Sequence, residues 1–258
     1  MTRVVCFIPS ITETLLDCGV DVVGRTRFCI HPNEKVKNIK VVGGTKDVKW
    51  DKLTELKPDL VILDKEENTL EMAEACPCPF FTLHITSLAN ISGELLSLAN
   101  KLNNSQLKEI AYQWKQIADS KTLNHIDLNH IPGAISYLGK VNHQKKLRTD
   151  LSKAKVDYLI WKDPWMAIGP ETFIWSVLCK LGFSQLLIRR DEKYPNIDSE
   201  SLPSDNCFYL FSSEPFPFEK HLDELNGINF TGALIDGELY SWYGTRSLRF
   251  LQSELKLS

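Results

Sequence analysis

Residues 4–19 of the 258-residue chain, VVCFIPSITETLLDCG, contain the pattern that decides the fold. The apolar run Val4–Ile8 predicts a buried β-strand. Ser10 and Glu13 have the spacing of a capping box, which predicts a helix that begins at Ser10 and ends at Gly19. A strand that leads directly into a helix is the first half of a βαβ unit, so the next strand is expected to run parallel to the first.

The same alternation of strands and helices fills both ends of the chain and is interrupted in the middle. Residues 88–121 show no strand pattern but carry apolar residues at helical spacing, with a kink or a break expected at 103–105. The segment 134–138 fits either a strand or a short helix. The chain is therefore predicted to consist of an N-terminal α/β lobe (1–87), a helical backbone and connector (88–153) and a C-terminal α/β lobe (154–258).

Apolar runs and helix signals divide the C-terminal lobe in the same way. Pro170 and Glu171 predict the start of a helix that ends at Leu181, before Gly182. Strands are predicted at 156–161, 185–188, 207–211 and 232–235, and further helices at 218–225 and 245–255.

Composition excludes several classes of protein. Hydrophobic residues make up 43% and charged residues 24%, and the net charge is −3, so the chain is not a disordered chain or a general binder of nucleic acid. No apolar run approaches the roughly 20 residues of a membrane-spanning helix. The N-terminus has no leader pattern, which predicts a cytoplasmic protein, or a periplasmic one if a leader has been trimmed off. Seven scattered cysteines fit the cytoplasm, and they are expected to be core or surface thiols rather than zinc ligands.

The common catalytic motifs are missing. The sequence has no nucleotide-binding glycine loop, no nucleophile elbow and no paired-histidine zinc motif. We therefore assign no catalytic residue and no metal ligand. His84 lies at the end of a predicted strand, where it is either a hydrogen-bonded structural residue or a residue that faces a cleft.

Unusual side chains gather in the loops that follow the predicted strands. Ligands of open α/β sheets bind beyond the carboxyl ends of the strands. Such loops contain four large aromatic residues, Phe28, Trp165, Trp242 and Tyr243. Exposed aromatic side chains are unfavourable in water, so another part of the protein or a ligand is expected to cover them. They either pack between the lobes or onto the connector, or they line a cleft for a large flat ligand. The loops are residues 25–32, 44–46, 65–68, 162–166, 212–218 and 237–244.

These segments, in this order, resemble the periplasmic substrate-binding proteins of ABC importers for cobalamin, haem and ferric siderophores, and above all the cobalamin-binding type. The stretch LKPDLVI (56–62) is typical of the whole superfamily, whereas residues 160–174 and 236–244 point to the cobalamin-binding subgroup. The similarity covers nearly the whole chain and is weakest at 122–153. Its other carriers are residues 9–13, 24–32, 42–45 and 212–218.

The resemblance implies a class III substrate-binding fold, in which two Rossmann-like lobes, each with a central parallel sheet, are joined by one long backbone helix, here at 88–121. It also implies a non-catalytic, monomeric protein that holds a cobalamin-like corrinoid, a haem or a ferric siderophore between its lobes. An exported member would deliver this small-molecule metal chelate to an ABC permease. No catalytic cofactor is implied.

The resemblance also assigns site residues. The aromatic rings would stack on the macrocycle, and Arg27 and Lys65 would meet its carboxylates or amide oxygens. One exposed carboxylate on each lobe, Glu71 and Glu200, would dock to the permease. The implied ligand-binding residues are Arg27, Phe28, Cys29, Thr45, Lys46, Lys65, Glu66, Trp165, Met166, Ser241, Trp242 and Tyr243.

Two departures from the family keep other hypotheses open. The chain has no export signal, and Lys65 and Glu66 stand where the cobalamin binder has an aromatic and a basic residue. A cytoplasmic homologue would store, carry or sense its ligand. It would alternatively be an enzyme or chaperone that acts on the ligand, or a partner-binding module that has lost the transport ligand. Cleft residues of the enzyme hypothesis are Lys46, Lys65, Glu66, Asp163 and His84.

Overall fold

A computed structural model describes residues 2–139, 154–204 and 206–257. The chain divides into two compact units. Unit 1 consists of residues 1–119 and 242–249, and unit 2 of residues 120–241 and 250–258. The helical residues 91–119 therefore belong to unit 1, whereas the predicted connector from residue 120 on belongs to unit 2, and its residues 140–153 lie outside the described residues.

Unit 1 is built on a five-stranded sheet in which every neighbouring pair is parallel. The alternation of strand and helix patterns along residues 1–87 predicted this arrangement. The strand order is β3-β2-β1-β4-β5. The strands are β1 (Arg3–Cys6), β2 (Asp21–Thr26), β3 (Lys40–Gly43), β4 (Leu60–Asp64) and β5 (Phe80–Leu83).

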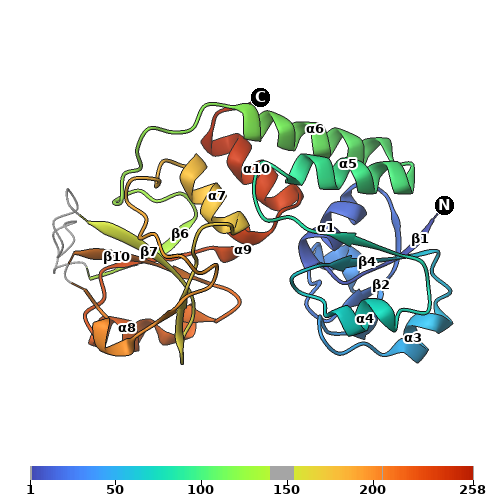
Figure 1. Ribbon diagram of the computed structural model, residues 1–258, viewed down its shortest axis with the longest axis horizontal. Coiled ribbons are helices and arrows are strands. Elements are labelled where there is room, and N and C mark those ends of the chain that lie inside the picture. The colour runs from blue at the N-terminus through green and yellow to red at the C-terminus, as the bar shows by residue number, and fades with distance from the viewer. Residues whose placement is uncertain (1, 140–153, 205, 258) are drawn as a thin grey trace. The chain divides into compact units, whose positions relative to one another are not determined.

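Helices cover both faces of this sheet. In Figure 1, α3 (Trp50–Glu55) and α4 (Leu70–Glu74) lie on one face, and α1 (Pro9–Asp17) lies on the other. The core on the α3 and α4 side contains Leu53 and Met72 from those helices. The short helix α2 (Asn33–Val36) precedes β3. Because the helices screen both faces, ligands can approach the sheet at its edges.

The first helix begins one residue earlier than the capping-box pattern predicts. Pro9 is its first residue, and Ile8 before it has an extended backbone. Proline starts a helix without a side-chain cap because its φ is already helical and its missing N–H needs no partner. Ser10 therefore lies inside the first turn. The helix does end before Gly19, whose φ is +67°.

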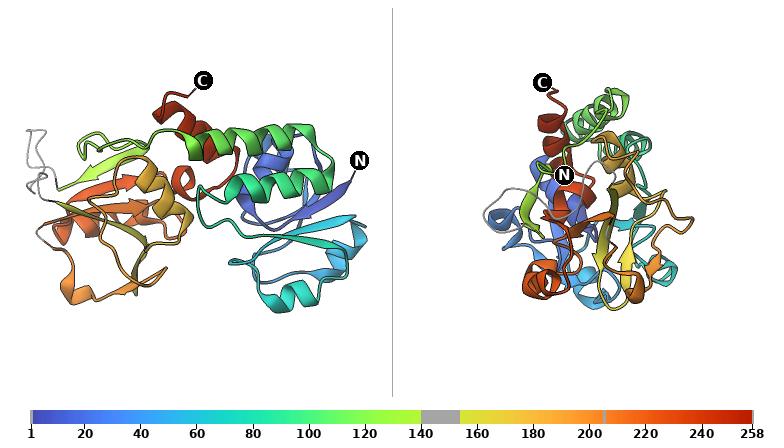
Figure 2. Two further views of the ribbon diagram at one scale, coloured as in Figure 1. Left: turned by 45° about the horizontal axis from the view of Figure 1, so that its top comes forward. Right: turned by 90° about the vertical axis from the view of Figure 1, so that its left-hand side faces the viewer.

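The helical middle segment is a pair of helices, α5 (Ile91–Leu102) and α6 (Ser105–Asp119), and not the one long helix that the family resemblance implied. The break falls inside the predicted interval, because Asn103 adopts the left-handed conformation (φ 49°, ψ 47°) that asparagine tolerates. The Asn104 side chain then accepts a hydrogen bond from the Leu107 N–H and caps α6. The two helices pack against each other within unit 1 (Figure 2).

Unit 2 contains a six-stranded sheet with the order β6-β11-β10-β7-β8-β9. Its centre is parallel, as predicted, because β10 pairs in parallel with both β11 and β7. The outer strands β6, β8 and β9 are antiparallel to their neighbours. The strands are β6 (Ala134–Leu138), β7 (Lys155–Trp161), β8 (Trp165–Ala167), β9 (Asn196–Ile197), β10 (Cys207–Ser212) and β11 (Gly232–Ile235).

Two predicted elements of unit 2 differ in the structure. Residues 185–188 form no strand, and only a bridge between Val156 and Leu187 links them to the sheet. The predicted helix begins at Phe173 instead of Pro170, because Glu171 has a φ of 66° and Thr172 is the cap. The helices of unit 2 are α7 (Phe173–Lys180), η1 (Ser199–Ser201), η2 (Phe218–His221), α8 (Leu222–Gly227) and α9 (Gly237–Ser241). The last helix, α10 (Thr245–Glu254), begins in unit 1 and ends in unit 2.

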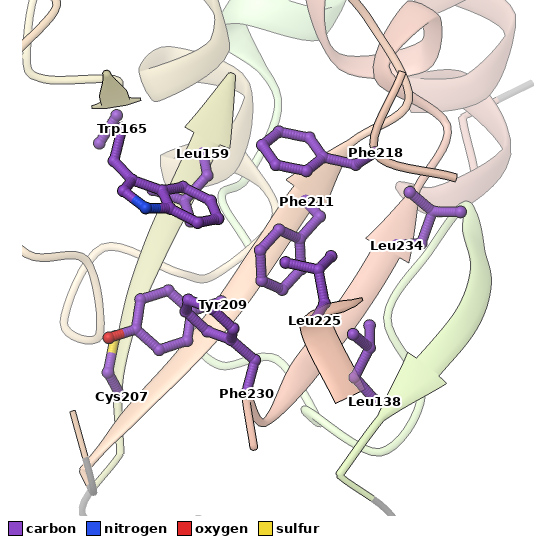
Figure 3. Packing of buried hydrophobic residues seen from close by; sticks show 11 residues of the cluster. Leu138, Leu159, Trp165, Cys207, Tyr209, Phe211, Phe218, Leu225, Phe230 and Leu234 are labelled. Carbon is purple, nitrogen blue, oxygen red and sulfur yellow. The ribbon is translucent and has the colours of Figure 1, made fainter. Parts of the chain in front are cut away.

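The core of unit 2 is rich in aromatic rings (Figure 3). Phe211 on β10 makes edge-to-face contacts with Phe218 and Phe230, with ring centroids 5.2 and 5.3 Å apart. Edge-to-face pairs add to the stabilisation that burial gives. None of the helices in the described ranges has the length and apolar character that a membrane span requires.

Candidate functional site

The carboxyl edge of the unit 1 sheet brings together part of the set of residues that the sequence assigned to a ligand. The loops after β2, β3 and β4 all leave the sheet at this edge, because the strands are parallel. From β1 the chain adds β2 and β3 on one side of the sheet and then β4 and β5 on the other side. The strand order therefore reverses between β1 and β4, and we call this place the reversal point. Ligands of such folds bind beside the reversal point. The predicted residues at this edge are Arg27, Phe28, Thr45, Lys46, Lys65 and Glu66.

Phe28 and Arg27 form an exposed pair after β2. Phe28 has 51% of its surface exposed, although it is a large apolar side chain. The Arg27 guanidinium lies 5.4 Å from the centre of the Phe28 ring and also pairs with Asp47 in the loop after β3. A cation over an open aromatic face suits a flat ligand that carries acidic groups.

Cys29 lies beneath this loop and is fully buried. Its Sγ is 3.2 Å from the Thr12 Oγ1 and 3.1 Å from the Thr26 Oγ1. Burial raises the pKa of the Cys29 thiol. The structure therefore places Cys29 in the core, where its side chain ties α1 to the end of β2 and does not reach the surface with Phe28.

Asp64 at the end of β4 organises the next two loops. Its Oδ1 accepts hydrogen bonds from the backbone N–H groups of Glu66 (2.8 Å) and Glu67 (3.0 Å). The Asn68 side chain accepts from the Asp64 N–H and donates to the Thr45 carbonyl, both at 2.7 Å. The loops after β3 and β4 are thus fixed to each other, while Lys46 and Lys65 remain exposed.

Two acidic groups in the loop after β4 have different surroundings. The Glu66 carboxylate lies 3.3 Å from the His84 Nε2, so His84 does lie at this edge and has an acidic neighbour there. Burial and the Asp64 carboxylate raise the pKa of Glu67, and the Lys46 ammonium opposes them. Basic and acidic groups therefore lie together at this edge.

A segment from the end of the chain completes unit 1 at the same place. We call residues 242–249 the strap, because they follow unit 2 in sequence but belong to unit 1. Tyr243 of the strap donates its phenol hydrogen to the Asp64 Oδ2 at 2.6 Å. Burial and the Asp64 charge raise the pKa of Tyr243 well above its usual value, so the phenol remains a neutral donor. The strap thus begins beside the reversal point of the sheet.

Trp242 of the strap is largely covered by its own unit. It has 8% of its surface exposed, its ring contacts the edge of His31 at 5.6 Å, and the Arg246 guanidinium lies 5.4 Å from its centre. Arg246 in turn makes two hydrogen bonds to the buried Glu13 carboxylate (3.0 and 2.8 Å). His31 was not assigned to the site from sequence, although it ends the same loop as Phe28.

In unit 2 the predicted residues do not share one exposed surface. Trp165 has 7% of its surface exposed and stacks on Phe218, with ring centroids 6.0 Å apart and planes at 13° (Figure 3). Trp165 therefore packs inside the core of unit 2, which neither of the two alternatives from the sequence described. Met166 is half-buried on β8, and the Ser241 hydroxyl donates to the Glu214 carboxylate at 2.5 Å.

The exposed aromatic residue at the carboxyl edge of the unit 2 sheet is Trp161, which sequence reasoning missed. It is the last residue of β7 and has 40% of its surface exposed. Its ring contacts Phe216 in the loop after β10. Its position in the sequence could have indicated this exposure, because the last residue of a buried strand lies at the edge of the sheet where the loops begin.

The two carboxylates proposed for docking are exposed. Glu71 lies in the first turn of α4, where its own backbone N–H and the Thr69 hydroxyl lower its pKa. Glu200 lies in η1 of unit 2. Exposure is necessary for a docking role, which stays a prediction. Within the described ranges, no three His, Cys, Asp or Glu side chains come close enough to hold a metal ion.

Comparison with known proteins identifies this architecture. Residues 4–126 match the family model described as periplasmic binding protein. The whole chain superposes on the periplasmic vitamin B12 binding protein BtuF of Vibrio cholerae with a TM-score of 0.65, covering 99% of this chain and 97% of that one at 15% identity. The fold is that of a periplasmic binding protein.

Other structures with the periplasmic binding protein fold match as completely. A periplasmic haem binding protein from Pseudomonas aeruginosa gives a TM-score of 0.67 at 17% identity, with coverage of 98% and 91%. IsdE of S. aureus, solved with haem, gives 0.64 at 15% identity, with coverage of 100% and 98%. No curated protein sequence matches significantly. These matches confirm the resemblance and the class III fold that the sequence predicted.

Proposed function

We propose that the chain is a non-catalytic binding protein for a planar metal chelate of the cobalamin, haem or ferric siderophore kind. The observation that carries this proposal is the exposed Phe28 ring with the Arg27 guanidinium over it, at the ligand-binding edge of a periplasmic binding protein fold. Structures with that fold include proteins named for vitamin B12 and for haem. An aromatic face suits the macrocycle, and the guanidinium suits its acidic or amide side groups.

The neighbouring loops support the same chemistry. Lys46 and Lys65 add positive charge beside Arg27, on loops that Asp64 and Asn68 hold in place. The backbone of these loops is already positioned, so it loses little conformational entropy when a ligand binds. Glu66 and Glu67 among them would disfavour a ligand with many acidic groups, which favours amide-bearing corrinoids over strongly anionic chelates.

The seven cysteines bear on the compartment. All seven are free, in a fold that family members use outside the cytoplasm. Free thiols are usual in reducing compartments. They support the hypothesis that this protein stores, carries or senses its ligand inside the cell. In the alternative, an exported copy would dock to an ABC permease through Glu71 and Glu200.

The test is a titration of the purified protein with hydroxocobalamin, haem and a ferric siderophore in parallel, followed by tryptophan fluorescence and by the absorbance of the ligand. We expect saturable quenching with one of the three. Phe28→Ala should weaken that binding about tenfold, in line with the loss of one aromatic contact of about 1.4 kcal/mol.

Phe80→Ala is the matched control. Phe80 belongs to the same unit and is similarly exposed (46%), but it lies on β5 away from the loop of Phe28. The control should bind like the original protein. Flat curves with all three ligands would overturn the proposal, and equal effects of the two substitutions would show that Phe28 does not face the ligand.

A further inference from the structure

The loop between α4 and β5 carries the two cysteines that are closest in the sequence, Cys76 and Cys78. It leads from α4, on one face of the unit 1 sheet, to the edge strand β5 (Figure 1). Because all strands of this sheet are parallel, the start of β5 lies at the amino edge, opposite the carboxyl edge that carries Phe28. The cysteine pair is therefore separate from the candidate ligand site.

The two cysteine side chains lie on the same side of this loop. The Cys76 thiol donates a hydrogen bond to the Cys78 carbonyl, with sulfur and oxygen 3.4 Å apart. Both side chains pack against the core cluster that contains Leu53 and Met72, and both remain partly exposed. Four of the other five cysteines are buried. Cys76 and Cys78 thus form a pair of neighbouring thiols that a solute can reach.

Prolines and hydrogen bonds fix the backbone of the loop. Pro77 lies between the cysteines and Pro79 follows them, and each proline fixes its own φ and restricts the residue before it. The Cys76 N–H donates to the Ala73 carbonyl at 3.3 Å. The Pro79 carbonyl accepts from the Val61 N–H at 2.9 Å. Because α4 and β4 hold the two ends, the loop loses little conformational entropy when both thiols bind one ion.

A pair of sulfur ligands suits a soft metal ion. Thiolates select copper(I), and two of them are sufficient to hold it, whereas a structural zinc ion takes four ligands. Burial raises the pKa of the Cys76 thiol more than its hydrogen bond to the Cys78 carbonyl lowers it. Cys76 is therefore protonated at neutral pH, and a metal ion that binds there displaces the proton.

We propose that Cys76 and Cys78 form a binding site for one copper(I) ion. Two sulfur–copper bonds form, two S–H bonds break, and both protons pass to the solvent. The copper keeps its charge of +1, so no electron is transferred. A reducing compartment keeps thiols free and thus keeps such a pair ready to bind. The site does not depend on the proposed function, because it lies at the other edge of the sheet.

The experiment is a titration of the full-length protein with the copper(I) complex of bicinchoninate, under argon and with ascorbate present. Transfer of copper to the protein lowers the absorbance of the complex, and we expect one ion per chain. Cys76→Ser and Cys78→Ser should each weaken binding at least about a hundredfold, since the loss of an outer partner of a metal ligand alone costs about 10–100-fold. Cys179→Ser is the matched control, because Cys179 is also free and half-buried, and it should bind like the original protein.

The contrary outcomes overturn the proposal. Absence of copper transfer, or transfer that both loop substitutions leave unchanged, would show that the pair is not a copper site. An effect of only one of the two substitutions would show that the thiols do not share an ion. Competition by an equal concentration of zinc would overturn the choice of copper(I). Circular dichroism of each variant shows that a lost site does not reflect an unfolded protein.

Discussion

The two units fix their ligand-side loops in different ways. In unit 1, hydrogen bonds from Asp64 and Asn68 tie the loops together, and the strap adds a phenol and a guanidinium. In unit 2, the loop after β10 is held by ring packing, from Phe216 through Phe218 to Trp165. Hydrogen bonds therefore position the loops that carry charged residues in unit 1, whereas apolar packing positions the aromatic rings in unit 2. One α/β architecture thus holds its loops in two ways, and substitutions in the two units should have different effects.

The largest effect should come from the aromatic core of unit 2. Trp165→Ala removes a buried ring and leaves a cavity, which should lower the free energy of unfolding by about 3–5 kcal/mol. Trp161→Ala, four residues earlier and exposed, should lower it by less than about 1 kcal/mol. Urea denaturation followed by circular dichroism measures both. Equal decreases in the free energy of unfolding would contradict the assignment of Trp165 to the core and of Trp161 to the surface.

The strap should give the next largest effect. Arg246→Ala leaves the buried Glu13 carboxylate without its paired donor, which should cost roughly 3 kcal/mol. Arg249→Ala breaks an exposed pair with Asp17 and should cost less than about 1 kcal/mol. The melting temperatures of the two variants test this difference. If packing alone held the strap, both substitutions would lower the melting temperature by the same small amount.

The smallest effect should come from the charged edge of unit 1. Because the folded protein raises the pKa of Glu67, its ionisation favours the unfolded chain once the pH rises above about 4.5, the usual value for this side chain. Glu67→Gln should therefore be slightly more stable than the original protein at pH 7 and equally stable below pH 4.5. Melting temperatures between pH 4 and pH 8 measure this difference. A variant that is less stable at pH 7 would show that the charge of Glu67 is favourable.

Much of the fold followed from local patterns. The strand at 232–235 was predicted with its observed bounds, since a short apolar run between turn residues leaves little choice. The three-residue strand β8 was missed because an antiparallel strand of that length shows no periodicity. The sequence pattern also predicted that α1 begins at Ser10, whereas the helix begins one residue earlier, at Pro9.

The sequence could predict which edge of the sheet carries the candidate site, but not which of its side chains are exposed there. Parallel strands put the loops of Phe28, Thr45 and Lys65 on one edge, so these residues could be grouped from sequence. Whether an aromatic residue in a loop is exposed or buried depends on partners far away in the chain. Trp165 is buried by Phe218 and Phe230, and Trp161 is left open, although both flank the same turn. No local pattern distinguishes them.

The strap has a consequence for the synthesis of the protein. Unit 1 starts at the N-terminus, yet its Glu13 and Asp64 wait for partners at Arg246 and Tyr243. A ribosome adds roughly 5–20 residues each second, so unit 1 remains incomplete until the strap at residues 242–249 has emerged. The nascent N-terminal half therefore lacks the Arg246 and Tyr243 partners of these two carboxylates, and a segment made after residues 120–241 of unit 2 closes the domain that was begun first.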